Sequence, residues 1–390
     1  MLGNFKYSNP TTLYFGDKAQ SHLAEALRPF GKKVMLIYGG GSIKRNGVYD
    51  DVMAALKEAD KEVVELSGVM PNPTVVKMEE GAQLARRHNV DFILAVGGGS
   101  TIDYAKAVSV ATWYDGDAWQ HFWVEQANPA PDARIIPLGA VLTMAGTGSE
   151  MNGGSVITNH AANLKIGKVF GTEVMPKFAV LNPRYTFSLP HRQLVAGIYD
   201  MFNHIMEQYF SGHDDSTSDY LAEGLMRSIV ASSLVAVKDP ANYEARSNLM
   251  WAATWALNTL ISQGKREDWM VHMLGHAIGA YTDATHGMTL SAVSEAYYRY
   301  VMQFCPAKFA RFAKVVWDIP AEGKSEEQLA SEGIDALMDW IRTIGAATRI
   351  SQIGATPEMI EGIADATIIL DSGYKKLTRA EVVDILRNSL

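Results

Sequence analysis

Cysteine is nearly absent from the sequence: Cys305 is the single one among 390 residues. An intramolecular disulfide is therefore excluded, and the composition is typical of a protein in a reducing compartment, so we expect a cytoplasmic location. The N-terminal stretch also lacks the charged segment and apolar core of a signal peptide. The apolar runs are too short to cross a bilayer, and we therefore expect no membrane partner.

An excess of basic residues is lacking too. The chain has 35 Lys and Arg against 43 Asp and Glu, a net charge of −8, without a basic stripe. Nucleic acids and anionic membranes bind positive surfaces, so neither is expected as a partner. The 47% of apolar and 20% of charged residues are ordinary for a globular enzyme. At this length the chain exceeds the usual limit for one hydrophobic core, which predicts two domains.

The first half of the chain alternates short apolar runs with helical patterns. Strands are predicted at 11–15, 34–38, 62–66, 92–96, 135–142 and 178–181, and helices at 18–28, 48–59, 75–88 and from Ile102 onward. Continuous apolar runs such as VMLIY and FILAV suit strands that are covered on both faces. The alternation predicts an α/β domain over residues 1–189, with a doubly wound, mostly parallel nucleotide-binding sheet.

Strand patterns are lacking beyond Leu189-Pro190, where only helical periodicity continues. Helices are predicted at 194–210, 218–236, 241–263, 268–280, 287–303, 306–316, 326–344, 356–370 and 378–389. The second domain, residues 190–390, is therefore expected to be all-α. In the first of these helices, Asp200, His204 and Glu207 form a polar stripe beside the apolar one.

Two GGGS segments, 39–42 and 97–100, each follow a predicted strand. In open α/β sheets ligands bind at the carboxyl ends of strands, and glycine lets a phosphate approach the free N–H groups of the next helix. A pyrophosphate at 97–100 is the natural interpretation. A plain strand-to-helix turn is the alternative, which the repetition of the motif disfavours.

The first GGGS loop lacks the acidic residue that would bind a ribose 2′-hydroxyl. Gly39 holds that place, and Ser42, Lys44 and Arg45 follow. This environment suits a 2′-phosphate and favours NADP(H) over NAD(H). The alternative is that Lys44 and Arg45 are solvated surface charges, as most are.

A third glycine-containing segment, 142–150, follows the predicted strand 135–142. Its small hydroxyl residues Thr143, Thr147 and Ser149 have groups that can hydrogen-bond a nicotinamide amide or a ribose. The segment alone is equally consistent with a structural loop.

One aspartate and several histidines repeat a helical spacing in two places. Asp200 and His204 are four residues apart, as are His272 and His276, and His286 follows after a break. Each pair projects from one helix face, so together they make an N/O ligand set suited to Zn²⁺ or Fe²⁺. Spacing alone lets either His272 or His276 bind the metal. Met273 stands where an H-E-x-x-H zinc protease has its general base, which argues against a protease.

Together these motifs resemble the iron-containing, or group III, alcohol dehydrogenases over essentially the whole chain. The matching segments are YGGGSIKRNG at 38–47, PNPT at 71–74, GGGSTIDYAK at 97–106, TMAGTGSEMN at 143–152 and the H-x-x-x-H…H-G stretch at 272–287. The segments GIYDMFNHIMEQY and EDWMVHMLGH look similar to the butanol-dehydrogenase-like branch, which includes NADPH-dependent aldehyde reductases.

The resemblance implies a role for each of these polar residues. The implied metal ligands are Asp200, His204, His272 and His286, and His276 is left as the catalytic residue near the substrate and proton path. The expected cofactor-binding residues are Gly39, Gly40, Gly41, Ser42, Asn72, Gly98, Gly99, Ser100, Asp103, Thr143, Thr147, Ser149, Lys165 and Tyr185. Lys168 is the alternative to Lys165 because the register is open there.

Two departures from the family pattern are visible. Asn182-Pro183 replaces the usual Asp-Pro, which puts a local turn contact in doubt. Tyr199 precedes the implied ligand Asp200 where a small residue or valine is common, and it could alter the shape of the substrate pocket.

The function implied by the resemblance is interconversion of aldehydes and primary alcohols by hydride transfer with NADP(H) and one divalent ion, Fe²⁺ or Zn²⁺. A homodimer is expected, and an apolar pocket near Trp251, Trp255 and Trp269. The alternatives are a dehydroquinate-synthase-like lyase or cyclase, a polyol dehydrogenase of the glycerol type, and a non-enzymatic nucleotide sensor. A lyase would need basic residues for an anionic substrate, and near the ligands only Lys265 and Arg266 are basic.

Overall fold

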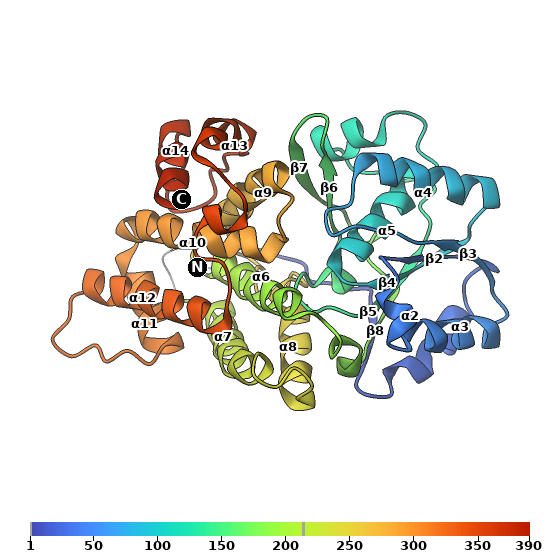
Figure 1. Cartoon of the computed structure of the whole chain (residues 1–390), viewed down its shortest axis with the longest axis horizontal. Helices are drawn as coiled ribbons and strands as arrows, with labels where there is room; N and C mark the ends of the chain where they lie inside the picture. Colours follow the sequence, from blue (N-terminus) through green and yellow to red (C-terminus); the bar gives the residue numbers. More distant parts are fainter. Residues whose placement is uncertain (1, 213–214) are drawn as a thin grey trace. The chain divides into compact units, whose positions relative to one another are not determined.

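The computed structural model describes residues 2–212 and 215–390, which form two compact units (Figure 1). The first unit is Ser8–Leu189. The second unit is Pro190–Leu390 together with the N-terminal segment up to Tyr7. Among the described residues, no helix is both long enough and apolar enough to span a membrane.

The first unit is built on a six-stranded sheet whose neighbouring strands all run parallel. The strands are β1 (Thr12–Phe15), β2 (Lys33–Tyr38), β3 (Glu62–Leu66), β4 (Phe92–Gly97), β5 (Leu138–Leu142) and β8 (Phe178–Leu181), in the order β1-β8-β5-β4-β2-β3. Every residue of β4, β5 and β8 is buried, as expected for strands with helices on both faces. The predicted α/β class is confirmed.

Helices cover both faces of this sheet. On one face, α1 (Leu23–Leu27) and α3 (Val48–Glu58) share a core with alternate residues of β2. On the other face lie α4 (Val75–His88) and α5 (Gly99–Ala111) (Figure 1). The short helices of this unit are η1 (Ala19–His22), α2 (Ser42–Arg45), η2 (Trp119–Val124), η3 (Ser149–Met151) and η4 (Pro183–Thr186).

The sequence-based prediction missed a hairpin here and misplaced the start of a helix. β6 (Gly154–Asn159) and β7 (Leu164–Val169) form an antiparallel hairpin that was not predicted, because β7 carries two lysines instead of an apolar run. The helix α5 begins at Gly99, earlier than the predicted Ile102. Glycine has poor helix propensity, but its cost is small in a first turn whose N–H groups have no intrahelical partner.

The described part of the second unit is all-helical, as predicted. Its helices are α6 (His191–Tyr209), α7 (Thr217–Ala236), α8 (Tyr243–Ala256), α9 (Met270–Thr282), α10 (His286–Val301), α11 (Pro306–Val316), α12 (Glu326–Ile344), α13 (Ile360–Ala366) and α14 (Arg379–Asn388), with shorter turns η5 (Met302–Phe304), η6 (Ile350–Ile353) and η7 (Pro357–Met359). The prediction was wrong for 241–263, since α8 ends at Ala256 and Thr259 then takes a positive φ of 73°. It was also too long at 356–370, where only η7 and α13 are helical.

Helix α6 forms the centre of the second unit. Every residue from Leu194 to Tyr209 is buried, and α7, α8, α9 and α10 all contact the helix. Close approach of α10 depends on Gly287, because a Cβ atom there would lie 2.0 Å from the carbonyl oxygen of Ala196. A Cβ atom on Gly275 of α9 would likewise lie 2.5 Å from Leu290 of α10. Two glycines therefore set how closely α10 packs against its neighbours.

We expect Gly287→Ala to lower the free energy of unfolding by about 1–3 kcal/mol, since the added methyl group meets backbone that cannot easily move. Gly224→Ala on α7 is the matched control, because a Cβ atom there meets nothing within 4 Å. It should be neutral or stabilise by up to about 1 kcal/mol through better helix propensity. Urea unfolding of both variants measures this, and equal midpoints would contradict the close packing at Gly287.

Candidate metal and cofactor sites

One carboxylate and three imidazoles converge in the second unit. The Oδ1 atom of Asp200 lies 3.5 Å from Nε2 of His204, 3.8 Å from Nε2 of His272 and 3.6 Å from Nε2 of His286. Asp200, His204 and His272 are buried and each offer one atom to a group that spans no more than 4.8 Å. The side chain of His286 is 23% exposed. The structure thus brings together all four residues that the family pattern implies as ligands.

The local fold explains this convergence. Asp200 and His204 stand one turn apart on α6, where the four-residue spacing puts both on one face. Helix α9 ends at Thr282, and the left-handed φ of 51° at the C-cap residue Asp283 lets the chain turn back. His286 is then the first residue of α10, and Gly287 lets the start of α10 approach α6 closely.

His276 lies beside this cluster. Its ring centroid is 5.1 Å from that of His286 and 6.0 Å from that of His272. Trp269 also flanks the histidines, with its ring 5.1 Å from His272. By contrast, the Trp251 and Trp255 rings pack on each other with centroids 5.2 Å apart, and Trp251 is 42% exposed. Of the three tryptophans expected near a pocket, Trp269 has a ring contact to the cluster.

The two GGGS loops meet at the switch point of the parallel sheet. β2 pairs with β3 on one side and with β4 on the other, so the chain reverses its direction of travel across the sheet there. The loops 39–42 and 97–100 follow these two adjacent strands. Ligands in open α/β sheets bind at such a point, and the N-terminus of α5 supplies free N–H groups at Gly99 and Ser100.

The loop after β5 packs tightly onto the second GGGS loop. A Cβ atom on Gly99 would lie 2.3 Å from the side chain of Thr147, and the N–H of Thr143 donates to the carbonyl of Gly97 at 2.9 Å. Gly99 is therefore required for contact between the two loops. Thr143 and Thr147 remain half-buried, with side chains at the same edge of the sheet.

A buried lysine joins two of the residues expected to bind the cofactor. Lys106 is fully buried and donates to Oγ of Ser149 at 2.7 Å, to Oδ1 of Asn152 at 3.2 Å and to the carbonyl of Gly154 at 2.8 Å. Ser149 in turn donates to Oδ1 of Asp103 at 2.6 Å. The side chains of Asp103 and Ser149 therefore bond to each other within the protein. Lys106 was missed in the sequence, although it follows Asp103 by one helical turn.

Burial dominates the electrostatics of this cluster. It lowers the pKa of Lys106 to about 8, while the charges of Asp103 and Glu150 act in the opposite direction. Burial also raises the pKa of Asp103, against the influence of Lys106 and the hydrogen bonds from Ser149 and Val156.

The two candidate lysines of β7 lie in different surroundings. Lys165 donates to Oδ1 of Asn72 at 2.9 Å, beside the loop whose Pro71 carbonyl accepts a hydrogen bond from Ser100. Lys168 instead donates to the carbonyl of Gln126 at 2.7 Å. Lys165 therefore lies with other expected cofactor residues, and Lys168 does not.

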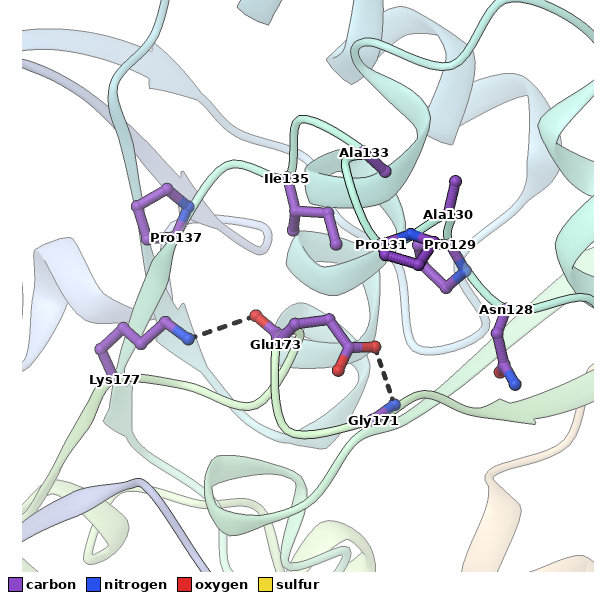
Figure 2. Close-up of a pocket in the computed structure, with 10 residues that line it drawn as sticks. All are labelled: Asn128, Pro129, Ala130, Pro131, Ala133, Ile135, Pro137, Gly171, Glu173 and Lys177. Atoms are coloured by element: carbon purple, nitrogen blue, oxygen red, sulfur yellow. Dashed lines mark hydrogen bonds between the residues drawn. The ribbon is translucent and has the colours of Figure 1, made fainter.

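A separate pocket of about 560 Å³ lies in the first unit (Figure 2). Its lining residues are Asn128, Pro129, Ala130, Pro131, Ala133, Ile135, Pro137, Gly171, Glu173 and Lys177. Lys177 donates to the backbone carbonyl of Glu173 at 3.2 Å, and the carboxylate of Glu173 accepts from the N–H of Gly171 at 3.1 Å. None of the expected cofactor residues lines this pocket.

The sequence did not indicate one carboxylate near the first GGGS loop, because it comes from a neighbouring strand and not from the loop itself. Glu65 of β3 accepts hydrogen bonds from the hydroxyls of Tyr38 and Tyr49, which lower its pKa, and lies 3.5 Å from the ammonium group of Lys44. Arg45 is exposed.

Tyr185 packs in the core beside α3. Its hydroxyl donates to the carboxylate of Asp51 at 2.7 Å, and burial raises its pKa. Asn182 stands where the family usually has Asp, and it caps η4 by accepting the N–H of Arg184 at 3.0 Å. The asparagine thus keeps the local turn contact.

A doubly wound sheet with glycine loops at its switch point, and a helical unit with an Asp/His cluster, are the features of a metal-dependent dehydrogenase. The chain belongs to the iron-containing alcohol dehydrogenase family. The family description "Iron-containing alcohol dehydrogenase" matches residues 10–183, and "Fe-containing alcohol dehydrogenase family, C-terminal" matches residues 194–390. The resemblance seen in the sequence is thereby confirmed.

Individual relatives span the whole chain. It is 40% identical to a probable NADH-dependent butanol dehydrogenase of Bacillus subtilis over 100% of both chains. It is 38% identical to an NADPH-dependent aldehyde reductase of Escherichia coli over 90% of each. The solved structure of an NADH-dependent butanol dehydrogenase from Thermotoga maritima matches with a TM-score of 0.93 at 37% identity, covering 100% of this chain and 99% of that one. The protein is an alcohol or aldehyde oxidoreductase, and its family implies a nicotinamide cofactor and a divalent metal.

The shifted pKa of Lys106 makes stability depend on pH. With a pKa of about 8 in the folded protein and 10.5 unfolded, the unfolded chain binds more protons between these pH values. The contribution of Lys106 to the free energy of unfolding therefore rises with pH in this window, by up to about 1.4 kcal/mol per pH unit. Urea unfolding of the wild type and Lys106→Met at pH 7.5, 8.5 and 9.5 should show a difference that grows with pH. A constant difference would mean that the pKa is not lowered.

Proposed function

We propose that the protein interconverts aldehydes and primary alcohols by hydride transfer, with one divalent ion held by Asp200, His204, His272 and His286. The observation that carries this proposal is the group of three Nε2 atoms 3.5–3.8 Å from the Asp200 carboxylate. Ligand atoms about 2.0–2.2 Å from a tetrahedral ion lie roughly 3.3–3.6 Å from one another, and the three separations from the Asp200 carboxylate lie within this range or slightly above it. Three imidazoles and one carboxylate accept Fe²⁺ or Zn²⁺.

The chain's own residues orient the reactants and handle the proton. A divalent ion held here supplies a Lewis acid for the substrate oxygen. His276, next to His286 but left outside the ligand set, returns a proton to the oxygen that becomes the alcohol hydroxyl, directly or through a water. Trp269 gives an apolar surface beside the histidines. The hydride chemistry itself belongs to the nicotinamide.

The cofactor contacts follow the edge of the parallel sheet. The backbone of Gly98, Gly99 and Ser100, at the start of α5, would bind the pyrophosphate. Thr143 and Thr147 lie on the adjoining loop and would face the nicotinamide half. Lys165, held by Asn72, would reach a ribose hydroxyl. Asp103 and Ser149 also hydrogen-bond each other, and Ser149 accepts from Lys106, so they support the loop between Thr143 and Asn152.

We propose NADP(H) over NAD(H) as the preferred cofactor. Gly39 presents no carboxylate to a ribose, and Lys44 and Arg45 place two cations in the following turn. The Lys44–Glu65 pair is more than a third exposed on both sides, so a 2′-phosphate can compete for the ammonium group. The relatives above differ in this property, since two are named for NADH and one for NADPH. The homodimer and the cytoplasmic location remain predictions.

His272→Ala and His276→Ala form a matched pair on one helix. The first should abolish bound metal and nearly all turnover, since it removes a ligand. The second should keep one metal per chain but lower kcat by about 10²-fold, because a proton donor is lost. Added imidazole should restore part of the kcat of His276→Ala. Metal analysis with steady-state kinetics measures both, and loss of metal from His276→Ala alone would exchange the two roles.

Gly39→Asp should shift the cofactor preference toward NADH, because a carboxylate would repel the 2′-phosphate and bind the ribose hydroxyl. We expect the ratio of kcat/KM for NADPH to that for NADH to fall at least about tenfold. Glu65→Gln should move the ratio the other way, since it releases Lys44 from its ion pair. A wild-type enzyme with a higher kcat/KM for NADH would contradict the proposed preference without either variant.

A further inference from the structure

Glu207 is a fully buried carboxylate that lies one turn from His204 on α6. Its Oε2 atom contacts Nδ1 of His272 and accepts a hydrogen bond from Nδ2 of Asn203 at 2.7 Å. Its Oε1 atom accepts the backbone N–H of His272 at 3.1 Å. The hydroxyl of Tyr298 donates to Oδ1 of Asn203 at 3.1 Å, which fixes the orientation of the Asn203 amide. Both oxygens of Glu207 are thus directed at donors around one histidine.

These contacts select one tautomer of His272. An ionised carboxylate only accepts hydrogen bonds, so its contact with Nδ1 of His272 favours a proton on Nδ1. The amide nitrogen of Asn203 lies 3.4 Å from the same Nδ1, but its shorter hydrogen bond, at 2.7 Å, goes to Oε2 of Glu207. The Nε2 atom then has its lone pair available, and it is this atom that lies 3.8 Å from Oδ1 of Asp200. A hydrogen bond from the distal ring nitrogen to a carboxylate also raises the basicity of the ligating nitrogen.

We propose that Glu207 is a positioning residue that makes His272, and not His276, a ligand of the metal ion. This inference rests on the ligand set of the proposed function and deepens it. The two histidines share a face of α9, so spacing gives them equal access, and the carboxylate on the neighbouring helix distinguishes them. Glu207 also places a second negative charge close to the site. Together with Asp200 it balances a divalent ion in surroundings with little solvent.

An amide cannot replace this carboxylate. Oε1 faces the backbone N–H of His272, and Oε2 faces Asn203 and the imidazole Nδ1–H. In Glu207→Gln, the NH₂ group takes the place of either Oε1 or Oε2. In both places it faces another hydrogen-bond donor. When it lies at the Oε2 position, the NH₂ group favours the opposite tautomer of His272, whose Nε2 carries the proton and cannot bind a metal. The substitution therefore keeps the size of the side chain but weakens its selection of the tautomer, because the amide oxygen can face Nδ1–H only if the NH₂ group faces the backbone N–H of His272.

The test measures Zn²⁺ affinity of the apo-protein, by competition with a chromophoric chelator, for the wild type, Glu207→Gln and Glu223→Gln. Glu223→Gln is the matched control, because Glu223 is also a buried carboxylate of the second unit but bonds Tyr209 and Arg311. We expect Glu207→Gln to bind Zn²⁺ about 10–100-fold more weakly. Glu223→Gln should bind Zn²⁺ within twofold of the wild type, even if its unfolding midpoint falls as far as that of Glu207→Gln.

The outcomes separate this inference from the proposed function. If Glu207→Gln is folded and binds Zn²⁺ as tightly as the wild type, the role of Glu207 is overturned while the ligand set stands. If His272→Ala binds Zn²⁺ as tightly as the wild type, the ligand set itself fails. Co²⁺ substitution gives a second readout, since the visible spectrum of Glu207→Gln should depart from that of the wild type, whereas a purely structural loss would leave the spectrum of the bound ion unchanged.

A measurement on the wild type keeps the inference testable if Glu207→Gln does not fold. Selective ¹⁵N labelling of histidine reports the tautomer of each ring in the metal-free protein, and the signal of His272 is assigned by its loss in His272→Ala. We expect the proton of His272 on Nδ1. A proton on Nε2 would overturn the proposed role of Glu207.

Discussion

The packing of the second unit depends on α6, a helix that carries buried polar groups and has no exposed face over its last four turns. A buried carboxylate is costly unless donors or a cation surround it, so Asp200 and Glu207 each require partners from other helices. The partners come from α9 and from the first turn of α10. The polar groups of α6 therefore determine where α9 and α10 must lie, and Gly275 and Gly287 allow the close packing that this requires. Packing and charge compensation are here a single constraint.

In the first unit the corresponding constraint is a lysine without access to solvent. Lys106 reaches from α5 to the loop 143–152 and to the start of β6, so it joins three segments that are distant in sequence. Its three hydrogen bonds offset part of the cost of burial, and the lowered pKa shows that part of the cost remains. A motif indicates Ser149 as a ligand-binding residue. Its hydrogen bond with Lys106 shows that it also supports the loop.

Much of the fold was predictable because apolar periodicity directly reflects burial. The strands VMLIY and FILAV and the helices near 306–316 and 326–344 are found where the pattern placed them. The hairpin β6–β7 was not predictable in this way, since Lys165 and Lys168 are buried through hydrogen bonds that no pattern of apolar residues reveals.

The candidate site divides similarly. Helical spacing indicated four residues of the Asp/His cluster, because two residues four apart on a helix share a face, and His286 follows in the same stretch after a break. The same spacing could not rank His272 against His276, since the difference that we propose between them lies in Glu207, a residue on another helix. Glu65 was missed for the same reason: it approaches Lys44 from the neighbouring strand and not from the loop that carries the motif.

The residues proposed to bind metal all belong to Pro190–Leu390, and those proposed to bind the cofactor all belong to Ser8–Leu189. Each half of the chemistry is therefore encoded by one continuous stretch of the gene. Substitutions that alter the nucleotide preference and substitutions that alter the choice of ion fall in separate cores, so their effects on stability should add. Such a division lets one lineage exchange its reductant without rebuilding the centre that activates the carbonyl, and it offers the same freedom to anyone who recombines the two stretches from different relatives.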